Sequence, residues 1–250
     1  MITLKLSNIY SQLSSNKSKI NKYINVLKIH DPTDPKFQED FAYFFALNPT
    51  DWIKNTSKIV GTDTWMEGIT RKEAFFQIFD KYMKMPKGTV TYSNIIQDLS
   101  SVPMRNGKGN VQISFSSKIL HVIDNNKPII DQKMLLKLAN SASGFTSSVG
   151  LKVTGKKKPV VHVGNGTICD AIKFYSDVET YYPKLISFNK QPKNSLETYM
   201  GNGKFDNKNQ GNYLDKNATY FDNFNTWLHE QNITAPISDV KKADFWMWLA

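Results

Sequence analysis

The sequence predicts a mainly α-helical protein with one small β element, and three observations support this. Apolar residues recur every three or four positions through most of the chain, as on the buried face of a helix. The period becomes strand-like only within 148–166, which predicts a β-hairpin. At 250 residues the chain can bury a sizeable core, either as one large domain, 1–250, or as two small lobes.

The first half of the chain is expected to form a series of amphipathic helices. Residues 1–29 indicate one or two helices with a serine-rich break near 14–18. Residues 37–47 indicate a helix with an aromatic stripe, which belongs either to the core or to a surface that stacks on nucleic-acid bases. Further helices are expected from 48 onward, over 70–84 and over 92–99.

A glycine-containing loop, 103–110, follows these helices and carries Arg105 and Lys108. It leads directly into the central stretch of the chain and could contact DNA phosphate. A solvated surface loop is the alternative, because glycine and charged residues are also typical of loops without a partner.

The central stretch, 114–138, reads as helix, tight loop, helix. Apolar residues line one side of the first helix, whereas Ser114, Lys118 and His121 fall together on the other side. Pro128 then holds the chain extended, since proline fixes its own φ and disfavours helical geometry in the residue before it. Asp131 precedes an amphipathic run and is predicted to cap the second helix, where a carboxylate is favoured by the helix dipole.

The predicted hairpin at 148–166 has a lysine-rich tip formed by Lys156, Lys157 and Lys158. The tip is interpreted as a DNA-contacting finger or a lid, or as a charged turn that only keeps an exposed strand edge soluble. A tyrosine-rich helix over 170–188, a long polar loop over 189–218 and two final helices over 219–231 and 240–249 are expected to follow.

The composition favours a polyanionic partner. The net charge is +10, with a pI of about 9.4, and only two of the 32 basic residues are arginines. An excess of lysine is typical of proteins that bind DNA through diffuse positive charge. The alternative is that the lysines only keep the chain soluble. The single cysteine, Cys169, excludes an internal disulfide and a thiolate-rich metal site.

The remaining features predict a protein of the cytoplasm. No apolar run approaches the length that crosses a bilayer, and the N-terminus lacks the basic-then-apolar order of a signal peptide. The four histidines are scattered without ligand spacing, so no metal and no other cofactor are expected. We expect a monomer.

The central stretch resembles a known family. Its pattern is Ser-Phe-x-Ser-Lys, two apolar residues and His, and later Pro, two apolar residues and Asp. This is similar to the oxoguanine-glycosylase-like branch of the helix-hairpin-helix DNA glycosylases. Segments 89–99 and 237–248 resemble the lead-in and the terminal helix of that branch. The resemblance covers about 75–140 and 170–250 in outline, is specific only over 114–135, and makes the hairpin an insertion.

The resemblance implies a two-lobed glycosylase-like fold that excises a base from double-stranded DNA after flipping it out. It assigns catalysis to Lys118 and Asp131 and substrate contacts to His121 and Phe115, and some similar proteins remove glucosylated hydroxymethylcytosine from phage DNA. One departure concerns the family's glycine-rich hairpin, which offers backbone amides to a DNA phosphate. Only Gly107 and Gly109 lie upstream, further from Lys118 than the usual spacing.

The chemistry of base excision fits these two residue types. Breaking the bond between base and sugar develops positive charge on the sugar, which a fixed carboxylate such as Asp131 stabilises. Asp131 could also orient water, whereas Lys118 could attack the sugar itself if its pKa is depressed. A DNA-binding protein without catalysis and a protein-interaction module are the alternatives. A metal nuclease is disfavoured, because the acidic residues form no recognisable cluster.

Overall fold

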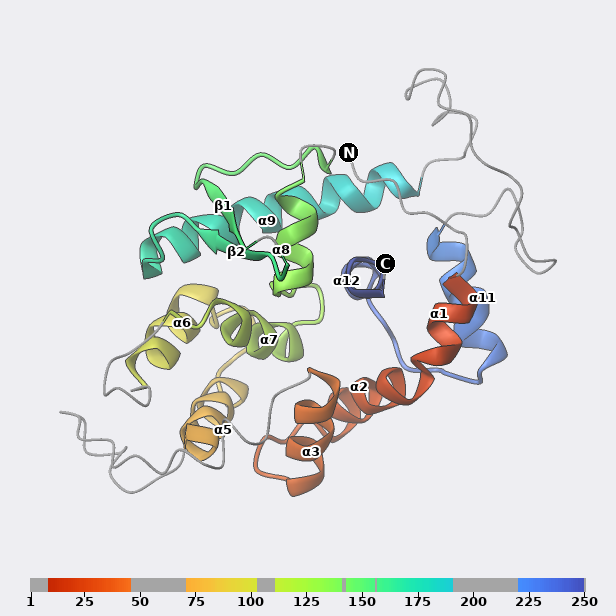
Figure 1. Ribbon diagram of the computed structural model, residues 1–250. Coiled ribbons are helices and arrows are strands. Elements are labelled where there is room, and N and C mark those ends of the chain that lie inside the picture. Colours follow the sequence, from red (N-terminus) through yellow and green to blue (C-terminus); the bar gives the residue numbers. More distant parts are fainter. Residues whose placement is uncertain are drawn as a thin grey trace, which may run out of the picture.

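The protein is mainly helical, as the sequence predicts, with one two-stranded hairpin (Figure 1). The computed structural model describes residues 9–45, 71–102, 111–140, 143–155, 157–190 and 220–249. Within these ranges it contains α1 (Ile9–Ser15), α2 (Lys17–Ile29), α3 (Pro35–Phe44), α5 (Arg71–Met83), α6 (Tyr92–Ser101), α7 (Ile113–Ile123), α8 (Gln132–Leu138), β1 (Leu151–Thr154), β2 (Val160–Val163), α9 (Ile168–Asn189), α11 (Tyr220–Glu230) and α12 (Asp239–Leu249).

Several expectations fall outside the described residues. These are the helix expected from 48 onward, the basic loop at 103–110 with Arg105 and Lys108, the tip residue Lys156, and all but the first two residues of the polar loop expected over 189–218. Residues 189 and 190 end α9 and cap it instead.

The N-terminal helices break and begin where the sequence indicates. A single residue, Asn16, separates α1 from α2, within the predicted serine-rich break. Asp34 caps α3 by accepting hydrogen bonds from the backbone N–H groups of Lys36 and Phe37, and Pro35 occupies the first helical position. The aromatic side chains of α3 pack on the core, so the core interpretation of that stripe holds for Phe37 and Phe41.

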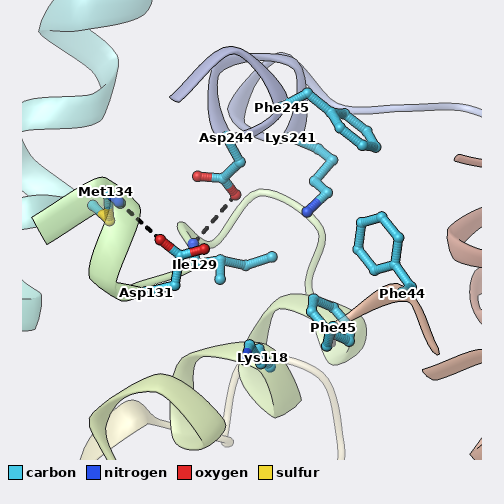
Figure 2. A pocket seen from close by; sticks show the side chains of 9 residues that line it. All are labelled: Phe44, Phe45, Lys118, Ile129, Asp131, Met134, Lys241, Asp244 and Phe245. Atoms are coloured by element: carbon cyan, nitrogen blue, oxygen red, sulfur yellow. Dashed lines mark hydrogen bonds between the residues drawn. The ribbon is translucent and has the colours of Figure 1, made fainter. Parts of the chain in front are cut away.

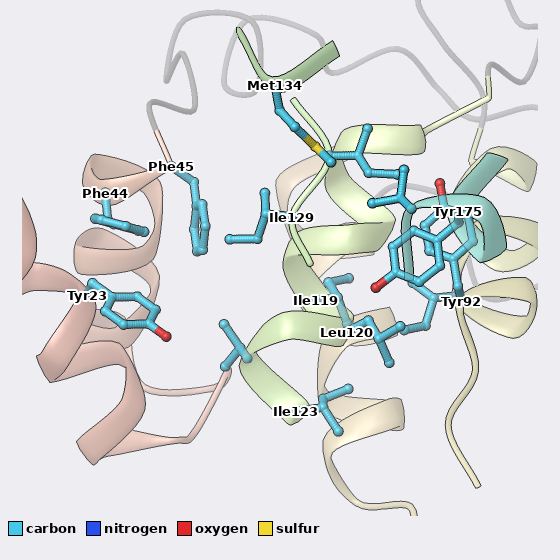
Figure 3. Packing of buried hydrophobic residues seen from close by; sticks show 14 of the residues in the cluster. Tyr23, Phe44, Phe45, Tyr92, Ile119, Leu120, Ile123, Ile129, Met134 and Tyr175 are labelled. Carbon is cyan, nitrogen blue, oxygen red and sulfur yellow. The ribbon is translucent and has the colours of Figure 1, made fainter. Parts of the chain in front are cut away.

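Helix α7 lies at the centre of the molecule and is buried on every side. Each residue from Ser116 to Ile123 is buried, including Lys118 and the fully enclosed His121. The side opposite the apolar stripe, on which the sequence places Lys118 and His121, is therefore enclosed as well. Figure 3 shows why: Tyr92 and Tyr175 cover Leu120 on one side of the helix, and Tyr23 lies on the other.

The connection from α7 to α8 is held in place by polar contacts from both of its neighbours. Ser117 Oγ of α7 accepts a hydrogen bond from the Ile130 N–H at 2.9 Å. Asp244 of α12 accepts one from the Ile129 N–H at 3.2 Å. Asp131 then caps α8, as predicted, by accepting from the Met134 N–H at 2.8 Å. This fixes the direction in which Asp131 leaves the chain.

The predicted hairpin is confirmed and packs on α8. Strands β1 and β2 are antiparallel, with Leu151 opposite Val163 and Thr154 opposite Val160. The Gln132 side-chain amide forms hydrogen bonds with both backbone groups of Val161, donating to its carbonyl oxygen and accepting from its N–H. The hairpin is therefore anchored to the helix that Asp131 caps.

Helix α12 closes the fold. It lies between α8 and α9 on one side and the group formed by α1, α2 and α11 on the other (Figure 1). Helices α1 and α11 are adjacent, and the Trp227 indole N–H donates to Ser14 Oγ at 3.2 Å. None of the described helices is both long enough and apolar enough to cross a bilayer.

Candidate active site

A small pocket at the meeting point of α3, α7, the 128–131 connection and α12 contains both sequence-predicted catalytic residues (Figure 2). Its cavity volume is about 50 Å³, enough for a few water molecules. A nucleotide therefore enters only if lining side chains move. The lining residues are Phe44, Phe45, Lys118, Ile129, Asp131, Met134, Lys241, Asp244 and Phe245.

Asp131 presents a carboxylate to this pocket. One oxygen, Oδ1, accepts the capping hydrogen bond from Met134, and the side chain is half-buried. The other oxygen, Oδ2, has no hydrogen bond to any described residue. The cap thus fixes the carboxylate and leaves one oxygen available to water or substrate.

Lys118 brings an amine into the same pocket, with only 8% of the residue exposed. Its Nζ lies 5.2 Å from the ring centroid of Phe115 and 5.6 Å from that of Phe45, and no described residue forms a hydrogen bond or ion pair with it. Burial lowers the pKa of Lys118 to about 8, against the opposing effect of the negative charge of Asp131. About a tenth of this amine is therefore unprotonated at pH 7, and the rest carries the proton.

A second lysine, Lys241, also lines the pocket and was missed in the sequence analysis. Only 4% of it is exposed, and its Nζ lies 4.8 to 5.6 Å from four aromatic ring centroids. Burial lowers the pKa of Lys241 to about 8, and the charge of Lys118 acts in the same direction, whereas Asp244 and Asp131 oppose it. The four rings are those of Tyr23, Phe44, Phe45 and Phe245.

Asp244 is the second acidic residue of the pocket. It is 7% exposed and accepts hydrogen bonds from the Ile129 N–H and the Tyr182 hydroxyl. Burial raises the pKa of Asp244 to about 7, although Lys241 and both hydrogen bonds favour its ionised form. Asp244 can therefore hold or release a proton near neutral pH.

His121 does not reach the pocket. It is fully buried, its Nε2 lies 2.8 Å from the Tyr23 hydroxyl, and its Nδ1 lies 2.6 Å from the Lys127 carbonyl oxygen. Burial and the charge of Lys241 lower its pKa well below the usual value, so the ring is neutral and bridges α2 to the 124–128 loop. The predicted contact with substrate would require this core contact to open.

Phe115 lies beside Lys118 but does not line the pocket, and it packs against Phe75 of α5 with a centroid separation of 5.7 Å. Of the predicted DNA-binding lysines, Lys157 and Lys158 are exposed at the hairpin tip, outside the pocket lining. Arg105, Lys108 and Lys156 lie outside the described residues.

The aromatic stripe of α3 has a double role. Phe37 and Phe41 are core residues, whereas Phe44 and Phe45, at the end of the same helix, form one wall of the pocket. One signal in the sequence could have identified Lys241. It lies four residues before Phe245, and this spacing places the two side chains on one face of the last helix. Without knowledge of what α12 packs against, a lysine there is normally read as solvated.

The pocket combines two amines of lowered proton affinity with a fixed carboxylate and a carboxyl that titrates near neutrality. Together these groups can perform acid–base and nucleophilic chemistry. No group of three potential metal ligands occurs in the described part of the chain. Comparisons with protein-family models, with curated proteins and with solved structures find no match for this chain.

Proposed function

We propose that this protein is a DNA glycosylase, which cleaves the bond between a base and its sugar and leaves an abasic site. The observation that supports this best is the meeting of Lys118 and Asp131 in one pocket, where the lysine amine has a pKa of about 8. An amine that is partly neutral can act as a nucleophile, and a carboxylate fixed by its helix can stabilise positive charge.

In this proposal Asp131 acts on the sugar. Its second oxygen, which accepts no hydrogen bond from a described residue, faces the developing positive charge as the base departs. The helix cap keeps this oxygen in place, so little reorganisation is needed in the transition state. Asp131 can also orient a water molecule toward the sugar carbon.

Lys118 can take the place of that water. Its neutral amine attacks C1′ of the sugar as the base leaves, and opening of the sugar ring then gives an imine. The buried position of the amine supports this route, because it lowers the proton affinity of the nitrogen. Burial of the amine therefore supports the lysine as nucleophile, whereas the missing glycine-rich hairpin in the sequence favours the water route.

The partner is proposed to be double-stranded DNA with the target nucleotide flipped out. The +10 net charge supports a polyanionic partner. The pocket is small, so base flipping is expected to displace side chains at its mouth. We propose a modified base as substrate, and defence against phage with glucosylated hydroxymethylcytosine as the biological role to be tested.

The test is incubation with duplexes that carry normal, oxidised, alkylated and glucosylated bases, followed by detection of abasic sites. Asp131→Asn should lower the rate of base release by about a hundredfold or more, because an amide caps the helix but carries no negative charge. The matched control is Asp34→Asn, which changes an equivalent cap of α3 that lies outside the pocket lining.

Asp34→Asn should leave base release unchanged. Full activity in Asp131→Asn would exclude both routes. DNA binding without abasic sites on any duplex would instead favour a binding protein without catalysis.

A further inference from the structure

Lys241 is a buried amine that points into the pocket without an acceptor. No described residue forms a hydrogen bond or an ion pair with its Nζ, although the residue is only 4% exposed. Figure 2 shows its side chain extending from α12 toward Phe44 and Phe45, beside Asp244 on the same helix. A buried ammonium with no acceptor is costly, so such a group is rarely kept for packing alone.

The next residue on α12, Lys242, forms an ordinary ion pair and provides a comparison for Lys241. Lys242 forms an ion pair with Asp239 at 3.0 Å, one turn earlier on α12. Lys241 turns the opposite way, into four aromatic rings that stabilise a cation but offer no strong hydrogen-bond acceptor. The position of its amine, rather than lysine content in general, distinguishes it.

Lys241 shares every relevant feature with Lys118. Both amines line one cavity of about 50 Å³, neither forms a hydrogen bond or an ion pair with a described residue, and both lie 5.6 Å from the ring centroid of Phe45. Burial lowers both pKa values to about 8. The charged and titratable groups that face Lys241 are Asp131, Asp244, Lys118, His121 and Tyr23.

We propose that Lys241 is a second amine of this pocket that forms an imine with an aldehyde. The nitrogen lone pair adds to the aldehyde carbon and the C=O π bond breaks, which leaves a positive charge on nitrogen and a negative charge on oxygen. A proton then passes from nitrogen to oxygen and gives a neutral carbinolamine. The carbinolamine hydroxyl then leaves as water with a proton from the carboxylic acid of Asp244, and the nitrogen lone pair closes the C=N bond of the iminium. Asp244 suits this role because it lines the same pocket and titrates near neutrality.

The natural aldehyde rests on the proposed function, since an abasic site in DNA opens to a sugar aldehyde. Lys118 would attack first in intact substrate, whereas Lys241 would capture the aldehyde of a product that stays bound. The pocket would then retain an abasic site through either amine.

The first experiment uses no DNA, so its result does not depend on base excision. The wild-type protein is treated at pH 7 with glycolaldehyde and cyanoborohydride, which converts an imine irreversibly to a secondary amine, and modified lysines are mapped by mass spectrometry. Lys118 and Lys241 should be modified at least about tenfold faster than the ion-paired Lys242 and the exposed Lys184, because both line the pocket and burial lowers the pKa of each to about 8. Modification of Lys241 no faster than these controls would overturn the inference.

The second experiment uses a duplex with a synthetic abasic site and borohydride, and again needs no base release. Lys118→Ala should retain a covalent adduct that maps to Lys241, and the double variant with Lys241→Met should give none. Methionine keeps the volume and apolar character of the site, and unfolding curves verify that each variant folds. Absence of an adduct in folded Lys118→Ala would overturn the inference even if base release by the wild type supports the proposed function. An adduct at Lys241 without base release on any duplex would support the inference and contradict the proposed function.

Discussion

At the scale of single residues, Lys118 and Lys241 are charges kept in a place that does not favour charge. Neither amine has an acceptor within the described chain, and the pKa of each is lowered to about 8 by burial. Since protonation is weaker in the folded than in the unfolded state, each lysine lowers the stability of the fold whenever it is protonated. The site is therefore expected to oppose folding.

This gives a prediction for Lys118→Met. Below pH 8 both the folded and the unfolded wild-type states carry the proton, so the whole cost is present and the variant should be more stable by about 1–3 kcal/mol. Between pH 8 and the ordinary lysine value of 10.5, the folded wild type binds fewer protons than the unfolded chain, and its stability rises with pH. The advantage of the variant should disappear over that interval in urea unfolding curves. An advantage that is constant from pH 7 to pH 11 would contradict the lowered pKa.

A second prediction concerns the pH dependence of adduct formation. If the neutral amine of Lys118 attacks, borohydride trapping on abasic DNA by Lys241→Met should rise about tenfold per pH unit and level off near pH 8. The measurement is a single-turnover rate at saturating DNA. A rate that continues to rise to pH 10 would indicate an amine of ordinary proton affinity.

At the scale of elements, the position of Asp131 depends on a serine of the preceding helix. Ser117 Oγ accepts from the N–H of Ile130, a fully buried residue directly before Asp131. We predict that Ser117→Ala destabilises the protein by about 1–3 kcal/mol, because it leaves a buried N–H unpaired. It should also lower the rate of base release, since the start of α8 loses its anchor.

The matched control is Ser116→Ala on the same helix. Ser116 is equally buried, but its hydroxyl donates to the Gln112 carbonyl, which also accepts from the Ser116 N–H. Its loss leaves no backbone group unpaired, so the unfolding free energy should change less. Equal effects of the two variants in denaturant unfolding would show that the bond to Ile130 contributes little.

The elements themselves were largely predictable, whereas the composition of the site was only half so. Periodicity located most of the described helices and the hairpin, and Asp131 was identified as a cap because its signal is local. The burial of α7 depends on α5 and α6, which pack against it, and on Tyr23 of α2 and Tyr175 of α9, which flank it in Figure 3. For the same reason His121 was expected in the pocket, and Lys241 and Asp244 were not: each assignment depends on what packs against the residue, and no local pattern records that.

At the scale of the whole molecule, the +10 net charge predicts salt-sensitive binding to DNA. The logarithm of the binding constant should fall linearly with the logarithm of salt concentration, because bound lysines release counterions. If the hairpin tip contacts phosphate, replacing Lys156, Lys157 and Lys158 by alanine should reduce that slope by up to about 3 in fluorescence anisotropy titrations.

A charge-matched variant provides the control for the hairpin. Lys17, Lys173 and Lys184 are exposed residues of α2 and α9 that line neither the pocket nor the hairpin tip, and their replacement lowers the net charge equally. This control should change the slope less than the hairpin variant. If the two slopes fall together, the tip acts only through overall charge.

The placement of α12 has a consequence for how the protein is made. Asp244 holds the Ile129 N–H, and Lys241 faces the same cavity, yet both belong to the helix that is translated after every other described element. A nascent chain can therefore assemble the packing of α2, α3, α6, α7 and α9 before its two acceptor-free amines are brought together. In that order of folding, the two amines come close together only after the helices that surround them have packed. The unfavourable burial of both amines is then imposed on a core that is already formed.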